Sequence, residues 1–403
     1  MITNMKDIKI GVIGLGARGA GLLRDVILPL KAGEVTAVCD VYLDRAEHGK
    51  DEVIQQQGTE PAVYTDYHDV IADENVNTVI IMTSWDAHIN IAIDAMNAGK
   101  IVGMEVGGAY SINECWQLVE TYERTKTPFM FLENCVFGRR ELLILNMVEL
   151  GVLGKIVHCA GGYQHDLRAE IAFGKENRHY RLRNYLKRNC ENYPTHELGP
   201  IARILNINHG NRMLTISSTA SKAEGLHDYI VANKPEDEEL INAEFMQGDI
   251  VTSVIKCANG ETITLTLDTT LPRYYSRNFT VRGTKGMYEE ATDSIFIDRA
   301  EDTEKDFKWL ETEVGNVERY FEKYEHPVWK KYMEDGVNGS HGGMDWLEFQ
   351  LFFDSIKNDK PMPVDVYDAA SWMAISVLSE YSVAHGGTPV EIPDFTKGAW
   401  LND

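Results

Sequence analysis

A glycine-rich turn near the start of the chain is the feature that most constrains its fold. An apolar run at 8–13 is followed by Gly14-Leu15-Gly16-Ala17-Arg18-Gly19 and then by a helix-like stretch at 20–30. Gly14 permits a tight turn out of a strand, Gly16 lets backbone N–H groups approach a pyrophosphate, and Gly19 lets the helix pack close to the sheet. The positive end of the helix dipole then faces the phosphates. This order of parts predicts a βαβ unit that binds a dinucleotide, which the glycine motif alone would indicate only weakly.

An acidic residue at the end of the next apolar run indicates which dinucleotide is bound. Asp40 follows the run at 35–39, where a carboxylate can accept hydrogen bonds from the adenosine ribose hydroxyls. It would repel a 2′-phosphate, so NAD is favoured over NADP, and only the nearby Arg45 keeps NADP open. The alternative is a glycine turn in an ordinary βα unit, with Asp40 capping a helix.

Composition narrows the class of protein. A chain of 403 residues is long enough for two domains, and its net charge of −23 argues against a nucleic-acid or anionic-membrane partner. Six well-separated cysteines, without a CxxC pair or a metal-type cluster, predict buried thiols in a reducing compartment and no metal site. The first strand pattern starts close to residue 1 and no apolar run would span a bilayer, so we expect a cytoplasmic protein. The expected partner is a small molecule, and an open sheet face would suit a homo-oligomer.

The periodicity of apolar residues divides the chain at about residue 126. Strand and helix patterns alternate before it, which predicts a parallel sheet wrapped by helices. After it, two helix-like stretches at 141–150 and 200–206 are interspersed with strand patterns at 155–160, 213–217, 250–257, 262–268, 278–282 and 295–298. The turn Asn259-Gly260 is typical of a hairpin. We therefore predict an α/β protein with a dinucleotide-binding Rossmann domain at 1–126 and an α+β domain at 127–403, whose open sheet is largely antiparallel.

Ligands of such parallel sheets bind at the carboxyl ends of the strands. We therefore expect five residues that follow the strand patterns at 78–82 and 101–104 to lie beside the cofactor: Trp85, Asp86, His88, Glu105 and Val106.

Two segments of the second half carry candidate catalytic groups. Tyr163 and His165 follow a strand and, two residues apart, would share one face; Tyr193 precedes His196 by one helical turn. Thr195 can cap the helix that starts here, close to Pro194. A histidine titrates near neutral pH, so His196 beside a nicotinamide could take a hydroxyl proton as the hydride leaves. The alternative is that these are satisfied, half-buried side chains.

The first half resembles the glucose-fructose oxidoreductase/inositol dehydrogenase/MocA family. The resemblance rests on the glycine motif, on His88 and on Gly99-Lys100. Most members continue after this Gly-Lys strand with Glu-Lys-Pro, whose lysine assists hydride transfer, whereas this chain has Glu105-Val106-Gly107-Gly108. The missing lysine argues against simple dehydrogenase chemistry.

One branch of that superfamily, glycoside hydrolase family 109, is similar over nearly the whole chain. Its matching segments are Gly103-Met104-Glu105-Val106, Glu133-Asn134, Gly161-Gly162-Tyr163-Gln164-His165-Asp166-Leu167-Arg168, Tyr193-Pro194-Thr195-His196, Asn206-Ile207-Asn208-x-Gly210-Asn211-Arg212, His341-Gly342-Gly343-Met344-Asp345 and Ile392-Pro393-Asp394-Phe395. The resemblance implies an NAD-dependent, retaining α-N-acetylgalactosaminidase. NAD would oxidise the hydroxyl at the third sugar carbon, loss of the second-carbon proton would expel the aglycone, and water addition and re-reduction would follow, outside the usual two-carboxylate scheme.

The resemblance also implies roles for single residues. His196 would be the base toward the third-carbon hydroxyl, and Tyr163 would exchange the proton at the second carbon. His165 and Glu133 match further active-site residues, although Glu133 could instead be a structural acceptor. Sugar contacts are expected from Tyr163, Arg181, Tyr193 and Tyr275, and additional cofactor contacts from Ala17, Arg18, Asn134 and His196.

Two other classes stay open at this point. An NAD-dependent sugar dehydrogenase of the same superfamily would accumulate NADH, and a non-enzymatic NAD-sensing module would leave the Tyr/His groups unexplained. The exact sugar, its anomer and its aglycone are also open. His341 with Asp345 is a further candidate pair, either beside the cleft or as a helix cap.

Overall fold

The computed structural model describes residues 7–298, 314–339 and 341–402, which form two compact units. The first unit combines Met1–Gly138 with Asp335–Ala370, and the second combines Arg139–Glu334 with Ser371–Asp403. The sequence placed its boundary after residue 126, whereas by packing the first unit extends to Gly138 and includes a segment from much later in the chain. The functional division into domains 1–126 and 127–403 stays a prediction.

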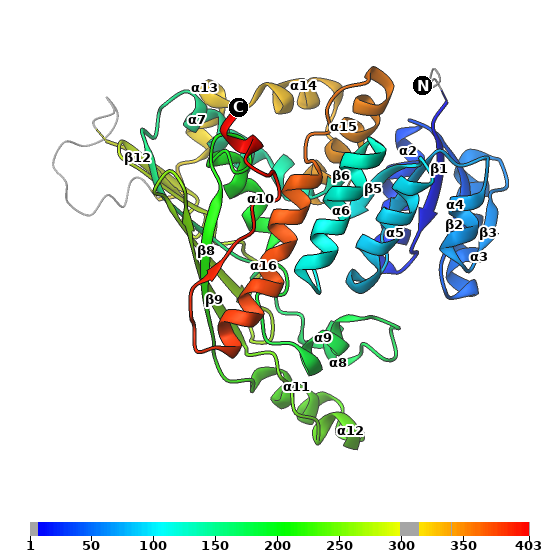
Figure 1. Ribbon diagram of the computed structural model, residues 1–403, viewed down its shortest axis with the longest axis horizontal. Helices are drawn as coiled ribbons and strands as arrows, with labels where there is room; N and C mark the ends of the chain where they lie inside the picture. Colours follow the sequence, from blue (N-terminus) through cyan, green and yellow to red (C-terminus); the bar gives the residue numbers. More distant parts are fainter. Residues whose placement is uncertain (1–6, 299–313, 340, 403) are drawn as a thin grey trace. The chain divides into compact units, whose positions relative to one another are not determined.

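A six-stranded parallel sheet organises the first unit (Figure 1). Its spatial order is β3-β2-β1-β4-β5-β6, so the order reverses between β1 and β4. In chain order the strands are β1 Lys9–Ile13, β2 Glu34–Cys39, β3 Ala62–Tyr64, β4 Thr78–Ile81, β5 Ile101–Glu105 and β6 Phe129–Leu132. Ligands of such sheets bind outside the carboxyl ends of the strands at the point of reversal, which is where the glycine turn follows β1. The predicted Rossmann fold is confirmed.

The predicted helix at 20–30 begins three residues earlier, at Ala17. It runs from α1 Ala17–Leu22 through a π-helical turn at η1 Leu23–Ile27 into α2 Leu28–Leu30. Helices α5 Trp85–Asn97 and α6 Ile112–Thr125 pack against each other in this unit (Figure 1). The remaining helices are α3 Leu43–Gln57, α4 Tyr67–Ala72, η2 Asn134–Phe137, η4 His341–Gly343 and α15 Met344–Asn358, and α16 Val366–Ala384 is divided between the two units.

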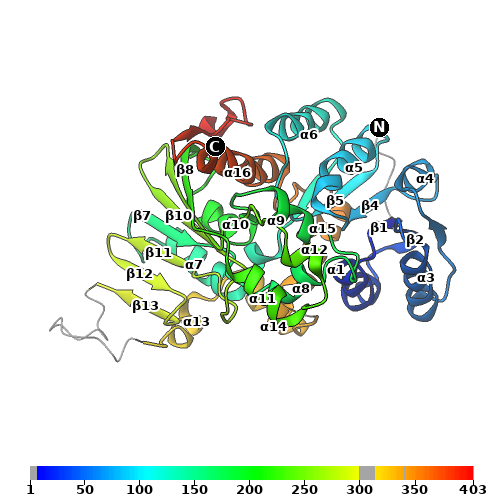
Figure 2. The same ribbon diagram turned by 90° about the horizontal axis from the view of Figure 1, so that it is seen from below.

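An eight-stranded sheet with the order β13-β12-β11-β7-β10-β9-β8-β14 organises the second unit (Figure 2). Its strands are β7 Ile156–Gly161, β8 Met213–Ala220, β9 Ile250–Cys257, β10 Thr262–Asp268, β11 Thr280–Gly283, β12 Gly286–Glu289, β13 Ser294–Ile297 and β14 Val390–Glu391. Among the described strands of this sheet, only β7 and β10 pair in parallel, so the predicted, largely antiparallel sheet is confirmed. Buried and exposed residues alternate along β9, as expected for a sheet with one solvated face.

Helix α10 Thr195–Ile204 positions the predicted catalytic histidine. It packs against α7 Arg139–Glu149 and against β7 and β10 (Figure 2). The prediction that Thr195 caps this helix is wrong: Pro194 is the N-cap residue, and the Thr195 hydroxyl, already inside the helix, accepts no N–H from the first turn. The other helices are α8 Arg168–Ala172, α9 Arg181–Lys187, α11 Gly225–Asn233, α12 Glu238–Ile241, α13 Glu318–Tyr324, α14 Pro327–Asp335 and η5 Ala399–Asn402.

Two further expectations concern the cysteines and membrane spans. All six cysteines are buried and carry free thiols, as predicted. Within the ranges that the structure describes, no helix combines the length and the apolar character needed to cross a membrane.

Candidate functional site

The glycine turn has the geometry that a bound dinucleotide requires. Gly14 has φ of +97°, and a Cβ there would lie 2.5 Å from the carbonyl oxygen of Met82. A Cβ on Gly19 would lie 2.1 Å from the Gly14 carbonyl oxygen, so only glycine allows the helix this close to the turn. At Gly16 the nearest atom to such a Cβ is 3.7 Å away, which leaves its backbone open to a phosphate. These residues fit NAD.

Asp40 holds the same turn from the end of β2. Its Oδ2 accepts the N–H of Leu15 at 2.7 Å and its Oδ1 accepts the N–H of Tyr42 at 2.9 Å, with 6% of the residue exposed. Each carboxylate oxygen has a second lone pair, so these bonds leave room for a ribose hydroxyl. Asp40 therefore organises the loop in addition to its predicted contact with the cofactor.

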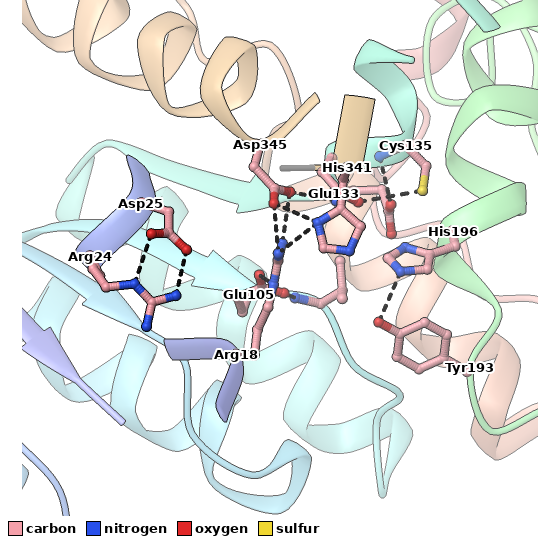
Figure 3. A network of polar contacts seen from close by, with 12 residues as sticks. Arg18, Arg24, Asp25, Glu105, Glu133, Cys135, Tyr193, His196, His341 and Asp345 are labelled. Carbon is pink, nitrogen blue, oxygen red and sulfur yellow. Dashed lines mark hydrogen bonds and ion pairs between the residues drawn. The ribbon is translucent and has the colours of Figure 1, made fainter. Parts of the chain in front are cut away.

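Arg18 of the glycine turn is paired with two acidic residues (Figure 3). Its Nε donates to Glu105 Oε1 at 2.9 Å, while Nη1 and Nη2 donate to the two carboxylate oxygens of Asp345 at 2.8 and 3.0 Å. The second oxygen of Glu105 accepts the N–H of Val106 at 3.0 Å. Sequence reasoning placed Arg18 and Glu105 at the cofactor but missed that they pair.

Asp345 also contacts His341 (Figure 3) and accepts a hydrogen bond from Asn134. Its Oδ1 accepts from Asn134 Nδ2 at 2.7 Å, and its Oδ2 lies 2.8 Å from His341 Nδ1. The residue is fully buried. Burial by itself raises the pKa of Asp345, but hydrogen bonds from His341 and Arg18, together with their charges, hold this pKa well below its usual range.

The residues expected beside the cofactor after β4 differ in exposure. Trp85 begins α5 and is buried, and a Cβ at Gly107 would lie 2.7 Å from its Cδ1. Asp86 is exposed. His88 is buried, with Nε2 2.9 Å from the carbonyl oxygen of Thr83, and burial lowers its pKa to about 4. His88 is thus a neutral imidazole that holds the turn, and the contacts of this group with NAD stay a prediction.

Glu133 acts as a structural hydrogen-bond acceptor, which was one of the two roles expected from the sequence. Its side chain is fully buried, and its Oε1 accepts the N–H of Cys135 at 3.1 Å, which caps η2. A catalytic role for Glu133 stays a prediction.

The second unit gathers the predicted tyrosine and histidine side chains. The hydroxyl of Tyr163 lies 3.0 Å from His165 Nδ1. The hydroxyl of Tyr193 lies 3.1 Å from His196 Nε2 (Figure 3). The rings of Tyr163 and Tyr193 are in contact, with centroids 4.3 Å apart, and Tyr275 lies edge-on to His165 at 5.2 Å. We call these five residues the ring cluster. Each hydroxyl–imidazole pair can pass a proton between its members.

Two glycines at the end of β7 allow this packing. A Cβ on Gly161 would lie 1.8 Å from Cγ of Glu197 in α10, and one on Gly162 would lie 1.9 Å from the Thr266 carbonyl oxygen in β10. Glycine therefore lets α10 and β10 approach the chain just before Tyr163. The backbone N–H of Asp268 then donates to the Tyr163 carbonyl at 3.0 Å, which fixes the turn.

Arg181 lies beside the ring cluster. Its guanidinium is 5.2 Å from the centroid of the Tyr193 ring, and its Nε forms an ion pair with Glu170 Oε1 at 2.7 Å. Burial and the nearby charge of Arg181 lower the pKa of His165, which favours the neutral imidazole. Sequence reasoning missed Glu170, because nothing in its spacing links it to Arg181. The sugar contacts of Arg181 and of the half-exposed Tyr275 stay predictions.

Comparisons with known protein families match both halves of the chain. A model described as "Oxidoreductase family, NAD-binding Rossmann fold" matches residues 8–132. One described as "Glycosyl hydrolase 109, C-terminal domain" matches residues 137–402.

Similar proteins and structures agree with these matches. The alpha-N-acetylgalactosaminidase of Tannerella forsythia is 36% identical over 418 residues, covering 98% of this chain and 87% of the relative. A glycosyl hydrolase family 109 protein of Stenotrophomonas maltophilia is 37% identical over 419 residues, covering 98% and 90%. An NAD binding oxidoreductase from Klebsiella pneumoniae shares the fold with a TM-score of 0.71 at 15% identity, covering 96% of this chain and 99% of that one. Levoglucosan dehydrogenase in complex with NADH shares it with a TM-score of 0.69 at 18% identity, covering 96% and 100%.

The glycine turn, the strand order and these matches define the class: an NAD-dependent protein with the fold of the glucose-fructose oxidoreductase/inositol dehydrogenase/MocA superfamily. NAD is its cofactor. Within that class the chain belongs to glycosyl hydrolase family 109.

Proposed function

We propose that this protein hydrolyses terminal α-N-acetylgalactosaminides or closely related glycosides, with NAD recycled in each turnover. The observation that carries the proposal is the ring cluster, with one hydroxyl–imidazole pair at Tyr163 and His165 and a second at Tyr193 and His196. Relatives from Tannerella forsythia and Shewanella oneidensis bear the name alpha-N-acetylgalactosaminidase, which supports this sugar as the substrate.

The residues of the chain have separate tasks in this proposal. The glycine turn and Asp40 hold NAD, with contacts from Arg18, Glu105 and Asn134. Bound NAD would supply the hydride acceptor, and later the hydride donor, for the third carbon of the sugar. His196 accepts the proton of the third-carbon hydroxyl, and its bond to Tyr193 orients the imidazole.

The second pair acts at the neighbouring carbon. Oxidation at the third carbon acidifies the proton on the second carbon. Tyr163 takes up that proton as its own hydroxyl proton passes to His165, and the bond to the aglycone breaks. Water then adds at the first carbon, and the proton returns to the second carbon. Arg181 and Tyr275 hold the sugar, with Arg181 fixed by its ion pair to Glu170.

A panel of chromogenic α- and β-glycosides, assayed with and without added NAD⁺ after the enzyme has been stripped of cofactor, tests the proposal. We expect aglycone release from the α-N-acetylgalactosaminide only when NAD⁺ is present. Equal release by the stripped enzyme would overturn the redox mechanism. NADH that builds up in proportion to substrate would instead identify the alternative, a sugar dehydrogenase. We also propose a cytoplasmic location and a homo-oligomer, which this assay does not test.

A further inference from the structure

The motif His341-Gly342-Gly343-Met344-Asp345 belongs to the first unit although it comes some two hundred residues after the end of its sheet. Helix α15, which begins at Met344, packs against η2 and β6. It thus brings Asp345 to Arg18 of the glycine turn (Figure 3). It also brings Asp345 to Asn134 of η2. The proposed function gives Asp345 no task.

The backbone before α15 is shaped to place these side chains. His341, Gly342 and Gly343 have φ values of +52°, +64° and +91°, and glycine adopts this left-handed conformation most readily. The tight turn brings His341 Nδ1 back to the carboxylate of Asp345 four residues later. The two glycines of the motif therefore allow the turn that places His341 against the carboxylate of Asp345.

We propose that Asp345 is the positioning residue that fixes Arg18 and Asn134 in a single geometry and thereby sets the affinity for NAD. The inference rests on the assignment of Arg18 and Asn134 to the cofactor in the proposed function. A planar guanidinium that donates two parallel hydrogen bonds to one carboxylate is held in position and in orientation. Without Asp345, Arg18 loses this two-point hold and keeps one bond to Glu105 and a longer contact, of 3.4 Å, between Nη1 and His341 Nδ1.

The acidic groups around Arg18 explain why Asp345 cannot be replaced by its neighbours. Glu348, one helical turn further along α15, is fully buried. Burial, followed by the charges of Glu105 and Asp345, raises its pKa well above the usual value, which favours its protonated form. Asp345 is therefore the buried acid of this helix whose charge is held by Arg18 and His341, and both Arg18 and Asn134 donate to it.

The experiment compares NAD⁺ binding by calorimetry in the full-length wild type, in Asp345→Asn and in Asp354→Asn, each stripped of cofactor. Asn keeps the volume of the buried side chain but loses its charge and presents N–H groups to those of Arg18. We expect the Kd for NAD⁺ to rise at least about tenfold in Asp345→Asn, because one partner of a buried charge pair is lost. Asp354 is exposed on the same helix, and its change should leave the Kd as in the wild type.

Activity measurements separate positioning from a general loss of structure. KM for NAD⁺ should rise with the Kd, while kcat at saturating NAD⁺ changes less than about threefold. A wild-type Kd in Asp345→Asn, or a fall in kcat at an unchanged Kd, overturns the inference. If that variant does not fold, His341→Ala removes one contact of Asp345 from an exposed position and should raise the Kd about two- to fivefold, and an unchanged Kd then overturns it. The calorimetry measures NAD⁺ binding directly and needs no glycoside. A wild type that cleaves no glycoside would therefore refute the proposed function, but the comparison of Kd values would still test the role of Asp345.

Discussion

The network around Arg18 in the first unit and the ring cluster in the second unit are built from different chemistry. Arg18 is held by the carboxyl groups of Glu105 and Asp345, with hydrogen bonds of 2.8–3.0 Å. The ring cluster instead joins neutral hydroxyls to imidazoles at 3.0–3.1 Å. Ion pairs of this kind hold a geometry firmly, because separating buried charges is costly.

The contrast assigns different tasks to the two regions. Groups that must stay in place are locked by opposite charges, which shift their pKa values away from neutral pH, as at Asp345. A hydroxyl–imidazole pair can pass a proton between its members. Changes in the first region should therefore act on cofactor binding and stability, and changes in the second on the rate of the chemical steps.

The largest effect is expected from Tyr163→Phe, which removes one hydroxyl from the ring cluster and keeps its ring. With the proton-exchange group at the second carbon gone, kcat should fall on the order of 100- to 10,000-fold. The Kd for NAD⁺ should stay within about twofold of the wild type, as measured by calorimetry. Tyr381→Phe, at an exposed tyrosine of the second unit, is the matched control and should keep full activity. If Tyr163→Phe retained a third or more of the wild-type kcat, the ring cluster would not have the catalytic task that distinguishes it from the network around Arg18.

The next effect concerns His88, a histidine of the first unit that serves structure rather than proton exchange. Its folded pKa of about 4 lies below the unfolded value of about 6.5, so the unfolded chain binds more protons between these pH values. Its contribution to stability is fully present above about pH 6.5 and is lost as the pH falls toward 4. The loss amounts to about 3 kcal/mol.

Urea unfolding at a series of pH values measures this loss. His88→Gln, which does not titrate, should be less stable than the wild type at neutral pH and should approach it as the pH falls toward 4. Parallel curves for the two proteins would show that His88 is not buried in its neutral form.

A smaller effect is expected from Gly19→Ala. The new Cβ would lie 2.1 Å from the Gly14 carbonyl, so the helix must move away from the turn, at a cost of about 1–3 kcal/mol in stability and with weaker NAD⁺ binding. Gly21→Ala, two residues further along, meets nothing within 4 Å and should be neutral or stabilising by up to about 1 kcal/mol. Thermal unfolding of the two variants gives this comparison, and equal effects would contradict the packing described for Gly19.

Local patterns in the sequence predict much of this molecule. The strands β9 and β10 match their predicted bounds, because buried residues recur along them at every second position. The glycine turn and both Tyr–His pairs were also predictable, since their members lie within a few residues of each other. Short strands such as β3 and β12 carry too few residues for a pattern, and sequence reasoning missed them.

Long-range pairing explains most of what the sequence could not predict. Arg18 and Asp345 are 327 residues apart, and no local pattern indicates that α15 returns to the first unit. The sequence predicts His341 and Asp345 as a pair, which the structure confirms, but it does not indicate that Arg18 binds Asp345. For Thr195 the residue type favoured a cap, whereas Pro194 holds the N-cap position, so the helix already includes Thr195.

Turnover of the α-N-acetylgalactosaminide in heavy water tests the recycling of NAD most directly. Mass spectrometry and NMR of the released sugar should find one deuterium at its second carbon, because the proton removed there is replaced from solvent. NADH should not accumulate, and omission of NAD⁺ should stop the release. Hydrolysis that leaves the second carbon free of deuterium, or that proceeds without NAD⁺, would contradict the redox-elimination mechanism.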